Sequence, residues 1–450
     1  MTFLKRFQSR LESLCLLPEK SKYVVAYSGG VDSHVLLYCC AKLDVPVRAV
    51  HVHHGLQSVA DEWVEHCQSI CKQLEIQLDV LYVDARRSNG QSPEEAARNV
   101  RYAALSKNLS NDDCLITAQH QNDQAETLLL QLLRTASAAG LAAMPDIKQI
   151  DNYFHIRPLL TFSRNEIESF AKDNGLQWVE DPSNQDATFD RNYLRKNVMP
   201  LLRNRWPEVD SQLSTVAVMQ SSNLVVLEDM AEIDLANVTR APSFQSDFFA
   251  YEIASVLSIS AIKKLSNERL YNLLRFWVIK EIKVSPTRNL LQEIEKTIIN
   301  AQQDVGSVIE FSGFEYRKYQ DFLYLLKKIN DENNAEDIIW NPNTSLMLAG
   351  VNVQLIANKT NGIGLKLDLL KKSLKVCFRQ GGEKFHPENR VHSQSLKKLL
   401  QEEGVPPWER GSFPLLYCDD ELVAVVGLWI SKSYAVGEGE DGWVVDVERL

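Results

Sequence analysis

Paired cysteines and long apolar runs are both missing from this sequence. Its eight cysteines include no C-x-x-C pair, so their spacing favours neither a zinc site nor a disulfide framework. No apolar run approaches the roughly 18 residues of a membrane helix, and no low-complexity tract indicates disorder. The first residues predict an amphipathic helix rather than a secretory signal. We therefore expect a multidomain globular protein of the reducing cytoplasm with no membrane partner.

An excess of basic charge is also missing, because the formal net charge is -10. Such a balance ordinarily argues against a nucleic-acid partner, which needs clustered lysine and arginine. Two local clusters reverse the balance. Residues 361–400 hold nine basic side chains against three acidic ones, and a second cluster comprises Arg191, Arg195, Lys196, Arg203 and Arg205. Each cluster alone is equally well explained as a solvated charged face.

The first 200 residues alternate between strand-like and helix-like segments. We expect strands at 23–27, 47–52, 78–83 and 114–118, and helices at 33–43, 61–74, 92–108, 123–134 and 163–174. This alternation predicts an α/β fold with a doubly wound parallel sheet. Ligands bind beyond the carboxyl ends of the strands in such sheets, so residues 28–33, 51–56, 84–86 and 119–123 are placed on one rim.

The chain has 450 residues, which fits about two to three domains. We expect a catalytic domain at 1–210, a mainly helical middle domain at 211–330 and a small α+β C-terminal domain at 338–450. Helices are predicted in the middle domain at 267–280 and 287–300. The acidic run at 331–337 has the composition of a linker.

The segment Ser28-Gly29-Gly30-Val31-Asp32-Ser33 lies between the first expected strand and the first expected helix. Adjacent glycines let a backbone approach an anion closely, while the serine hydroxyls and the helix-opening amides face the same point. A carboxylate in a phosphate-binding loop repels the phosphate unless a cation lies between the two groups. Asp32 therefore predicts Mg²⁺ bound together with ATP. The segment has neither the Walker A ending nor the third glycine of the dinucleotide fingerprint. It resembles the PP-loop of N-type ATP pyrophosphatases; a plain Ser/Gly turn is the structural alternative.

Three further motifs supply candidate site residues. His53 belongs to a histidine-rich stretch that ends the second strand, where an imidazole either contacts phosphate or caps the strand. Asp123 and Glu126 lie three residues apart at the start of a helix, where they suit Mg²⁺ or a substrate ammonium, or are ordinary N-terminal helix acids. Arg191 and Arg195 lie four apart and suit a phosphate clamp.

In their order along the chain, these segments resemble the tRNA(Ile)-lysidine synthase family. The matching blocks are 28–33, 53–56, 123–127, 133–144, 157–160, 181–184, 191–195, 404–410 and 414–416. The chain departs from the family's usual pattern at Gln119 and Gln57, where histidine and arginine are common, and at Asn122, where aspartate is common. The family usually has glycines just after the Leu-Arg pair at 133–134, where this chain has Thr135 and Ser137. We therefore assign no essential role to Gln119, Asn122 or Gln57.

The resemblance implies a two-step ligation on the wobble cytidine of tRNA(Ile) with a CAU anticodon. ATP adenylates the C2 oxygen and releases pyrophosphate, and the amine of free L-lysine then displaces AMP to form lysidine. Decoding changes from AUG to AUA, and amino-acid identity changes from Met to Ile. The C-terminal domain is expected to bind the tRNA.

The resemblance also implies roles for the candidate residues. Residues 28–33 and His53 bind ATP, and Asp32 holds Mg²⁺. Asp123 or Glu126 orients the lysine amine and accepts its proton. Arg191 and Arg195, the other two residues expected to be catalytic, hold phosphates near the target cytidine.

Two other function classes share the loop. A tRNA thiolation enzyme uses the same adenylation but needs a paired or reactive cysteine, and none is recognisable here. A non-enzymatic nucleotide-binding module shares the fold but does not need the 123–127 block or a basic C-terminal domain. The sequence leaves open whether the chain forms a homodimer.

Overall fold

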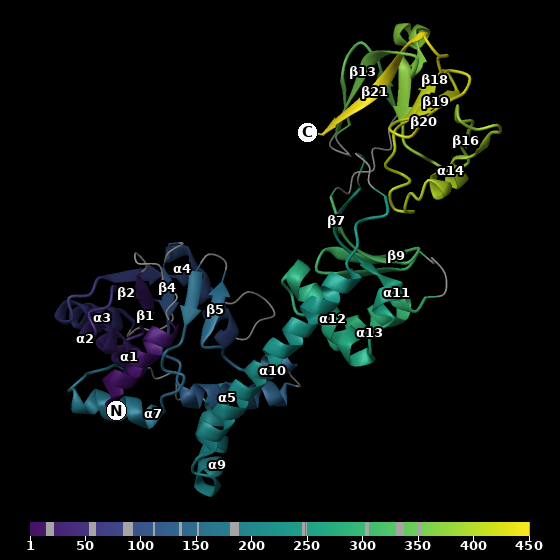
Figure 1. Cartoon of the computed structure of the whole chain (residues 1–450). Helices are drawn as coiled ribbons and strands as arrows, with labels where there is room; N and C mark the ends of the chain where they lie inside the picture. Colours follow the sequence, from purple (N-terminus) through teal and green to yellow (C-terminus); the bar gives the residue numbers. More distant parts are fainter. Residues whose placement is uncertain are drawn as a thin grey trace. The chain divides into compact units, whose positions relative to one another are not determined.

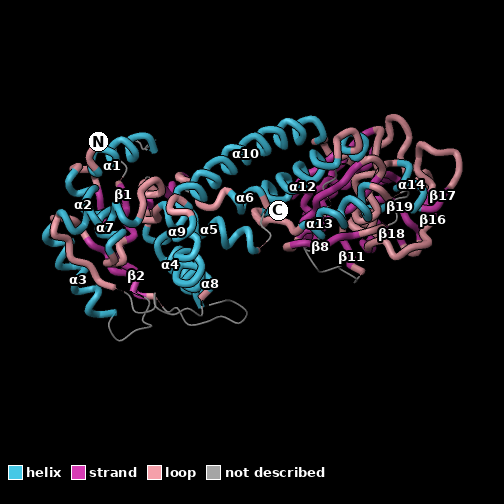
Figure 2. Tube along the Cα trace, turned by 90° about the horizontal axis from the view of Figure 1, so that it is seen from below, coloured by secondary structure: helices cyan, strands magenta, loops and turns pink. Residues whose placement is uncertain are grey.

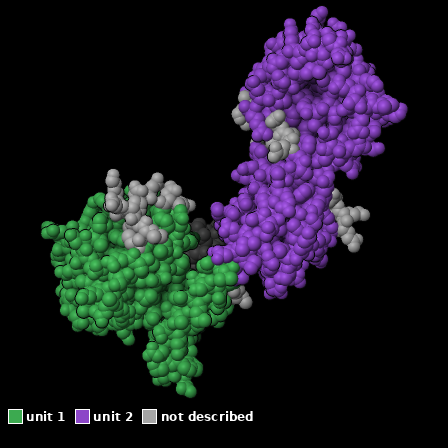
Figure 3. Space-filling view, viewed as in Figure 1, with its two compact units in different colours: residues 1–226 green, residues 227–450 purple. Residues whose placement is uncertain are grey.

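The computed structural model describes residues 1–14, 22–53, 60–83, 93–110, 113–134, 137–150, 153–180, 189–244, 248, 250–301, 306–329, 337–348 and 353–449. The chain divides into two compact units, residues 1–226 and 227–450 (Figure 3). Among the described helices, none is long and apolar enough to cross a membrane. The three domain ranges given above stay predictions.

The first unit alternates strands and helices as its sequence pattern predicts (Figure 1). Its strands are β1 (Tyr23–Ala26), β2 (Val47–His53), β3 (Leu78–Tyr82), β4 (Cys114–Ile116), β5 (Ile147–Ile150) and β6 (Tyr153–Ile156). Its helices are α1 (Phe3–Leu14), α2 (Val31–Lys42), α3 (Ala60–Gln73), α4 (Pro93–Asn108), α5 (Gln121–Leu133), α6 (Ala138–Leu141), α7 (Arg164–Asp173), α8 (Asp190–Tyr193), a π-helix (Leu194–Val198), α9 (Met199–Arg205) and most of α10 (Val209–Val238).

The six strands form one sheet in the order β3-β2-β1-β4-β6-β5, parallel except for β5. Helices α1, α2, α3 and α7 pack on the face that carries Val25 and Ile116, and Figure 2 shows α2, α3 and α7 grouped together. On the opposite face, Leu105 of α4 packs against Val24 and Leu115. The doubly wound sheet is therefore confirmed, and its strand order reverses between β1 and β4, which is where such folds bind ligands.

The second unit contains helices and antiparallel sheets. Strands β7 (Tyr251–Ser258), β8 (Val308–Phe311), β9 (Phe314–Tyr319) and β10 (Phe322–Lys328) form one sheet, beside α11 (Ile259–Ile262), α12 (Asn267–Ile282), α13 (Arg288–Glu293) and a π-helix (Ile294–Ile299). These helices bury Leu273, Trp277 and Ile298 against the sheet residues Leu323 and Leu325.

The last part of the chain has further antiparallel sheets around the core residues Trp340 and Trp443. The elements are β11 (Ile338–Trp340), β12 (Leu346–Leu348), β13 (Val353–Asn361), β14 (Leu365–Lys366), a 3₁₀ helix (Leu367–Lys371), β15 (Leu374–Cys377), β16 (Lys384–Phe385), β17 (Gln394–Ser395), α14 (Leu396–Glu402), β18 (Leu415–Cys418), β19 (Glu421–Val425), β20 (Trp429–Ile430) and β21 (Asp441–Arg449). The predicted α+β class of this region is confirmed.

Candidate active site

The segment from Ser28 to Ser33 turns the chain from β1 into α2, as the sequence predicts. The Ser28 hydroxyl lies 3.0 Å from the Ser33 hydroxyl, and the Ser33 hydroxyl donates to the Gly30 carbonyl at 3.0 Å. The Ser28 amide donates to Ser33 Oγ at 3.2 Å. These bonds hold both hydroxyls beside the first turn of α2, where the helix dipole favours an anion.

Gly29 is required at its position for two reasons. Its φ of +85° lies in the left-handed region, and a Cβ there would lie 3.0 Å from Val179 Cγ2 and 3.1 Å from Cys67 Sγ. The Gly29 carbonyl also accepts from the Val179 amide at 3.1 Å. The loop is thus packed against α3 and the segment after α7, and a side chain at Gly29 would push it out of place.

Asp32 lies in the first turn of α2 and faces two basic groups. Its Oδ2 is paired with the Arg164 guanidinium, and His120 Nε2 lies 3.8 Å from its Oδ1. Oδ1 is buried and has no hydrogen-bond partner among the described residues. Burial raises the pKa of Asp32, although His120 and Arg164 act in the opposite direction.

His120 connects Asp32 to the start of α5. Its backbone amide donates to Asp123 Oδ2 at 3.1 Å, and its Nδ1 accepts from the Asp123 amide at 3.4 Å in a capping box. Because Nδ1 accepts, the neutral ring carries its proton on Nε2, which lies 3.4 Å from Asp123 Oδ2. His120 therefore faces both acids; the sequence pattern placed it on the predicted rim but gave it no role, and it did not indicate Arg164 at all.

Asp123 and Glu126 share one face of α5, as predicted, and meet the two predicted arginines there. Arg195 donates to Glu126 Oε1 through Nε at 2.7 Å, to Oε2 through Nη2 at 2.7 Å, and to Asp123 Oδ1 at 3.1 Å. Arg191 Nε donates to Glu126 Oε2 at 3.0 Å. Glu126 is only 1% exposed, so two guanidinium groups neutralise a buried carboxylate.

The charges in this cluster shift one another's protonation. Burial alone would raise the pKa of Asp123, but His120, Arg191 and Arg195 together hold it below its ordinary value. Burial disfavours the charge of Arg195, yet the hydrogen bonds to Glu126 raise its pKa. Arg195 lies in the π-helix at 194–198, an irregularity often found at functional sites.

The other predicted positions are less closely associated. His53 ends β2, with Nε2 at 3.2 Å from Asp61 Oδ1 and its ring beside Tyr82, and no contact to residues 28–33 is found in the described chain. The predicted rim residues 54–56 and 84–86 and the block at 181–184 lie outside the described residues. Among the described cysteines, all but Cys377 are buried.

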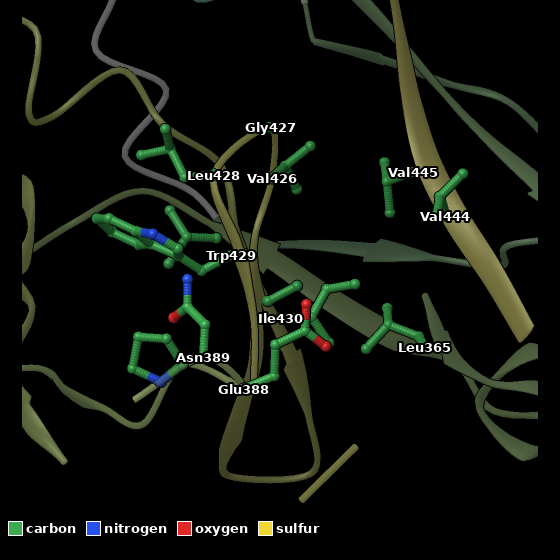
Figure 4. A pocket seen from close by; sticks show the side chains of 13 residues that line it. Leu365, Glu388, Asn389, Val426, Gly427, Leu428, Trp429, Ile430, Val444 and Val445 are labelled. Atoms are coloured by element: carbon green, nitrogen blue, oxygen red, sulfur yellow. The ribbon is translucent and has the colours of Figure 1, made fainter. Parts of the chain in front are cut away.

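A separate hollow of about 240 Å³ lies in the last part of the chain (Figure 4). Its walls include Leu365, Trp429 and Ile430, and the Glu388 carboxylate lies between Ile430 and Leu365 in the figure. None of the predicted site residues lines it.

Comparison with known proteins identifies three family models along the chain. A PP-loop domain matches residues 3–202, a TilS substrate binding domain 257–324 and a TilS substrate C-terminal domain 374–447. A tRNA(Ile)-lysidine synthase of Coxiella burnetii is 38% identical over 442 residues, 97% of this chain and 96% of the relative. Proteins of the same name from Methylococcus capsulatus and Serratia proteamaculans are 37% and 35% identical, over 92% and 93% of this chain and 93% and 94% of theirs.

Proposed function

This chain belongs to the tRNA(Ile)-lysidine synthase family, and we propose from that premise that it joins free lysine to C2 of the wobble cytidine in CAU-anticodon tRNA(Ile). The observation that carries the proposal is the pairing of a PP-loop with the cluster of Asp123, Glu126, Arg191 and Arg195 at one edge of one sheet. An ATP-cleaving loop alone is common to several reactions, whereas paired carboxylates beside it suit an amine substrate.

The first step is adenylation of the cytidine C2 oxygen. That oxygen attacks the α-phosphorus of ATP, the bond to the β-phosphate oxygen breaks, and pyrophosphate leaves. Ser28, Ser33 and the amides that open α2 bind the phosphates. An unactivated C2 oxygen is a poor leaving group and AMP is a good one, so this step makes the later substitution feasible.

Mg²⁺ fits the donor set around Asp32. Its buried Oδ1 lacks a partner among the described residues, and Mg²⁺ is commonly held by one or two carboxylates together with substrate phosphates. Bound there, the cation would neutralise charge on the departing pyrophosphate. Arg164 occupies Oδ2 and leaves only Oδ1 available.

The second step is attack of the lysine ε-amine on C2, which expels AMP. The amine enters as an ammonium and must lose a proton to a nearby base. Asp123 is the better placed acceptor, because only its Oδ1 accepts a hydrogen bond from a guanidinium group and its Oδ2 accepts from the neutral His120 amide, whereas both oxygens of Glu126 accept from guanidinium groups. Glu126 orients Arg191 and Arg195 and adds negative charge that attracts the ammonium.

The arginines and the second unit provide candidate tRNA contacts. Arg191 and Arg195 contact carboxylates in this structure, so a phosphate contact requires an exchange of partners. In the second unit, Lys384 and Lys397 lie on β16 and α14 within the basic cluster at 361–400. The expected product is a tRNA(Ile), formed in the cytoplasm, that decodes AUA rather than AUG.

The test is incorporation of labelled lysine into CAU-anticodon tRNA(Ile) in the presence of ATP and Mg²⁺, with methionine tRNA as the matched control. We expect label in the isoleucine tRNA alone, with one pyrophosphate and one AMP released per lysine. Absence of label, together with ATP-dependent sulfur transfer to tRNA, would instead assign the chain to the thiolation enzymes.

A further inference from the structure

A buried row of polar side chains runs from Arg157 to the edge of the sheet that carries the PP-loop. Arg157 Nη2 lies 3.1 Å from His155 Nδ1, and His155 Nε2 lies 2.7 Å from the Thr117 hydroxyl. The Thr117 hydroxyl donates to Gln119 Oε1. His155 is 1% exposed and Arg157 is 4% exposed, so this row is shielded from solvent.

The chemistry of Arg157 sets the direction of every bond in the row. A guanidinium only donates, so His155 Nδ1 accepts and the neutral ring carries its proton on Nε2. Burial lowers the pKa of His155 to about 3, which keeps that ring neutral at physiological pH. His155 Nε2 then donates to Thr117, whose own proton goes to Gln119 Oε1.

The consequence for Gln119 is a fixed orientation. Its carboxamide oxygen is occupied, and its NH₂ group remains as a pair of donors on a half-buried side chain. Reversal of the amide would bring NH₂ toward the Thr117 hydroxyl and would disrupt a shielded bond.

Gln119 also lies close to the candidate active site in the sheet. Val25 of β1 pairs with Ile116 of β4, and these two strands are parallel neighbours. Ser28 lies three residues after Val25 and Gln119 lies three residues after Ile116, so both follow their strands at the same level of the sheet. The residue after Gln119 is His120, which lies 3.8 Å from Asp32. The carboxamide therefore leaves the sheet at the same edge as the PP-loop.

We propose that Gln119 binds an acceptor oxygen of a nucleotide substrate through its NH₂ group, and that Thr117 is a positioning residue that orients it. His155 holds the Thr117 hydroxyl through its hydrogen bond, and Arg157 in turn fixes His155. The ligand chemistry is a phosphate, ribose or carbonyl oxygen, supplied either by ATP or by the target cytidine. This inference rests on the proposed function and adds a substrate contact to it.

The experiment measures kcat and KM for ATP and for tRNA in the lysine-incorporation assay. Gln119→Ala removes the donor and is expected to lower kcat/KM for one of the two substrates about two- to tenfold, the range of one neutral hydrogen bond. A rise in KM for ATP alone identifies ATP as the source of the oxygen, and a rise for tRNA alone identifies the cytidine. Gln77→Ala, before β3 at the opposite edge of the sheet, is the matched control.

Thr117 is tested by rescue and by a double variant. Thr117→Val removes the hydroxyl with little change in shape and should affect the same substrate, whereas Thr117→Ser should restore the wild-type value. In a Gln119→Ala background, Thr117→Val should cause less than about a twofold further loss, because Thr117 acts through Gln119.

Wild-type kinetics in Gln119→Ala would overturn the substrate contact. Independent, multiplying losses in the double variant would overturn the positioning role. Failure of the wild-type protein to incorporate lysine would refute the proposed function instead, so the two ideas fail separately. Thermal unfolding of each variant shows whether the fold is retained.

Discussion

Replacement of Glu126 by glutamine tests the charge cluster most directly. The side chain keeps its shape but loses one negative charge at a position that is 1% exposed. Its two oxygens accept from Arg195 Nε and Nη2, both at 2.7 Å, and from Arg191 Nε at 3.0 Å. A carboxamide presents one oxygen and one NH₂ group, so at least one guanidinium donor loses its acceptor.

The size of the effect follows from these contacts. A hydrogen bond to a charged group contributes about 1.5–3 kcal/mol. Arg195 is 40% exposed at its side chain, so water replaces part of the lost contact and the expected loss of unfolding free energy is nearer about 1.5 kcal/mol. The same range of about 1.5–3 kcal/mol applies to the lysine ammonium, which loses one attracting carboxylate. Lysine should therefore bind or react about ten- to a hundredfold less well.

The assay separates the two chemical steps. Pyrophosphate release from ATP and tRNA without lysine reports adenylation, and labelled lysine incorporation reports transfer. In Glu126→Gln we expect pyrophosphate release within about threefold of wild type and transfer slowed by the larger factor. Asp113→Asn is the matched control, since Asp113 pairs with Arg48 at 3.0 Å before β4, at the other edge of the sheet. Equal losses in both steps of Glu126→Gln would refute a lysine-specific role.

Three further changes have defined outcomes. Gly29→Ala should cost about 1 kcal/mol or more in thermal unfolding and weaken ATP binding measured by calorimetry, because its φ is +85° and the added Cβ meets Val179 and Cys67; an unchanged ATP affinity would contradict this. Asp32→Asn should slow Mg²⁺-dependent pyrophosphate release tenfold or more, which corresponds to an increase of about 1.4 kcal/mol or more in activation free energy. Its affinity for tRNA, measured by filter binding, should be retained. Burial raises the pKa of Glu409 to about 7 from an ordinary 4.5, so its contribution to stability is fully present below about pH 4.5 and is lost as pH rises to about 7. Between pH 5 and pH 8 the unfolding free energy of the wild type, measured in urea, should therefore fall by about 2–3 kcal/mol relative to that of Glu409→Gln. Parallel plots of unfolding free energy against pH for the two proteins would refute the raised pKa of this buried carboxyl.

Local sequence signals located most of the first unit. The strands at 23–26 and 47–53 and the helices at 31–42 and 60–73 agree with the prediction to within about two residues, because apolar periodicity is strong there. The helix expected at 163–174 is present at 164–173, where Ser163 and Glu166 form a capping box and Gly175, just after the helix, has a left-handed backbone. The hairpin of β5 and β6 was missed, since its strands are four residues each and their burial depends on β4.

The middle of the chain illustrates a different limit. The helices at 267–282 and 288–293 follow from their periodic apolar residues and from the caps at Ser266 and Thr287. In the sheet of β7 to β10, Tyr251–Ser258 pairs with Phe322–Lys328, which begins about 64 residues later, and no local pattern specifies this pairing.

Side-chain partners in the site were the least predictable feature. The spacing of Asp123 and Glu126 predicts that both lie on one face of a helix, and the spacing of Arg191 and Arg195 predicts the same of the two arginines. Neither motif shows that these two faces contact each other. Arg164 gave no signal as a site residue, because its role follows only from α7 ending up beside α2. These contacts arise from tertiary packing between segments about 65 and 132 residues apart.

The charges around the site constrain how substrates enter it. Asp32, Asp123 and Glu126 face the three guanidinium groups of Arg164, Arg191 and Arg195, so the net charge of these six side chains is close to zero. A lysine ammonium added alone would give the cluster an excess of positive charge in a buried setting, which is costly. A triphosphate adds several negative charges and gives the arginines an alternative partner, which would free Asp123 and Glu126 for the ammonium. Under the proposed function, this balance favours lysine binding after the nucleotide, and it ties the amine's access to the step that activates the cytidine.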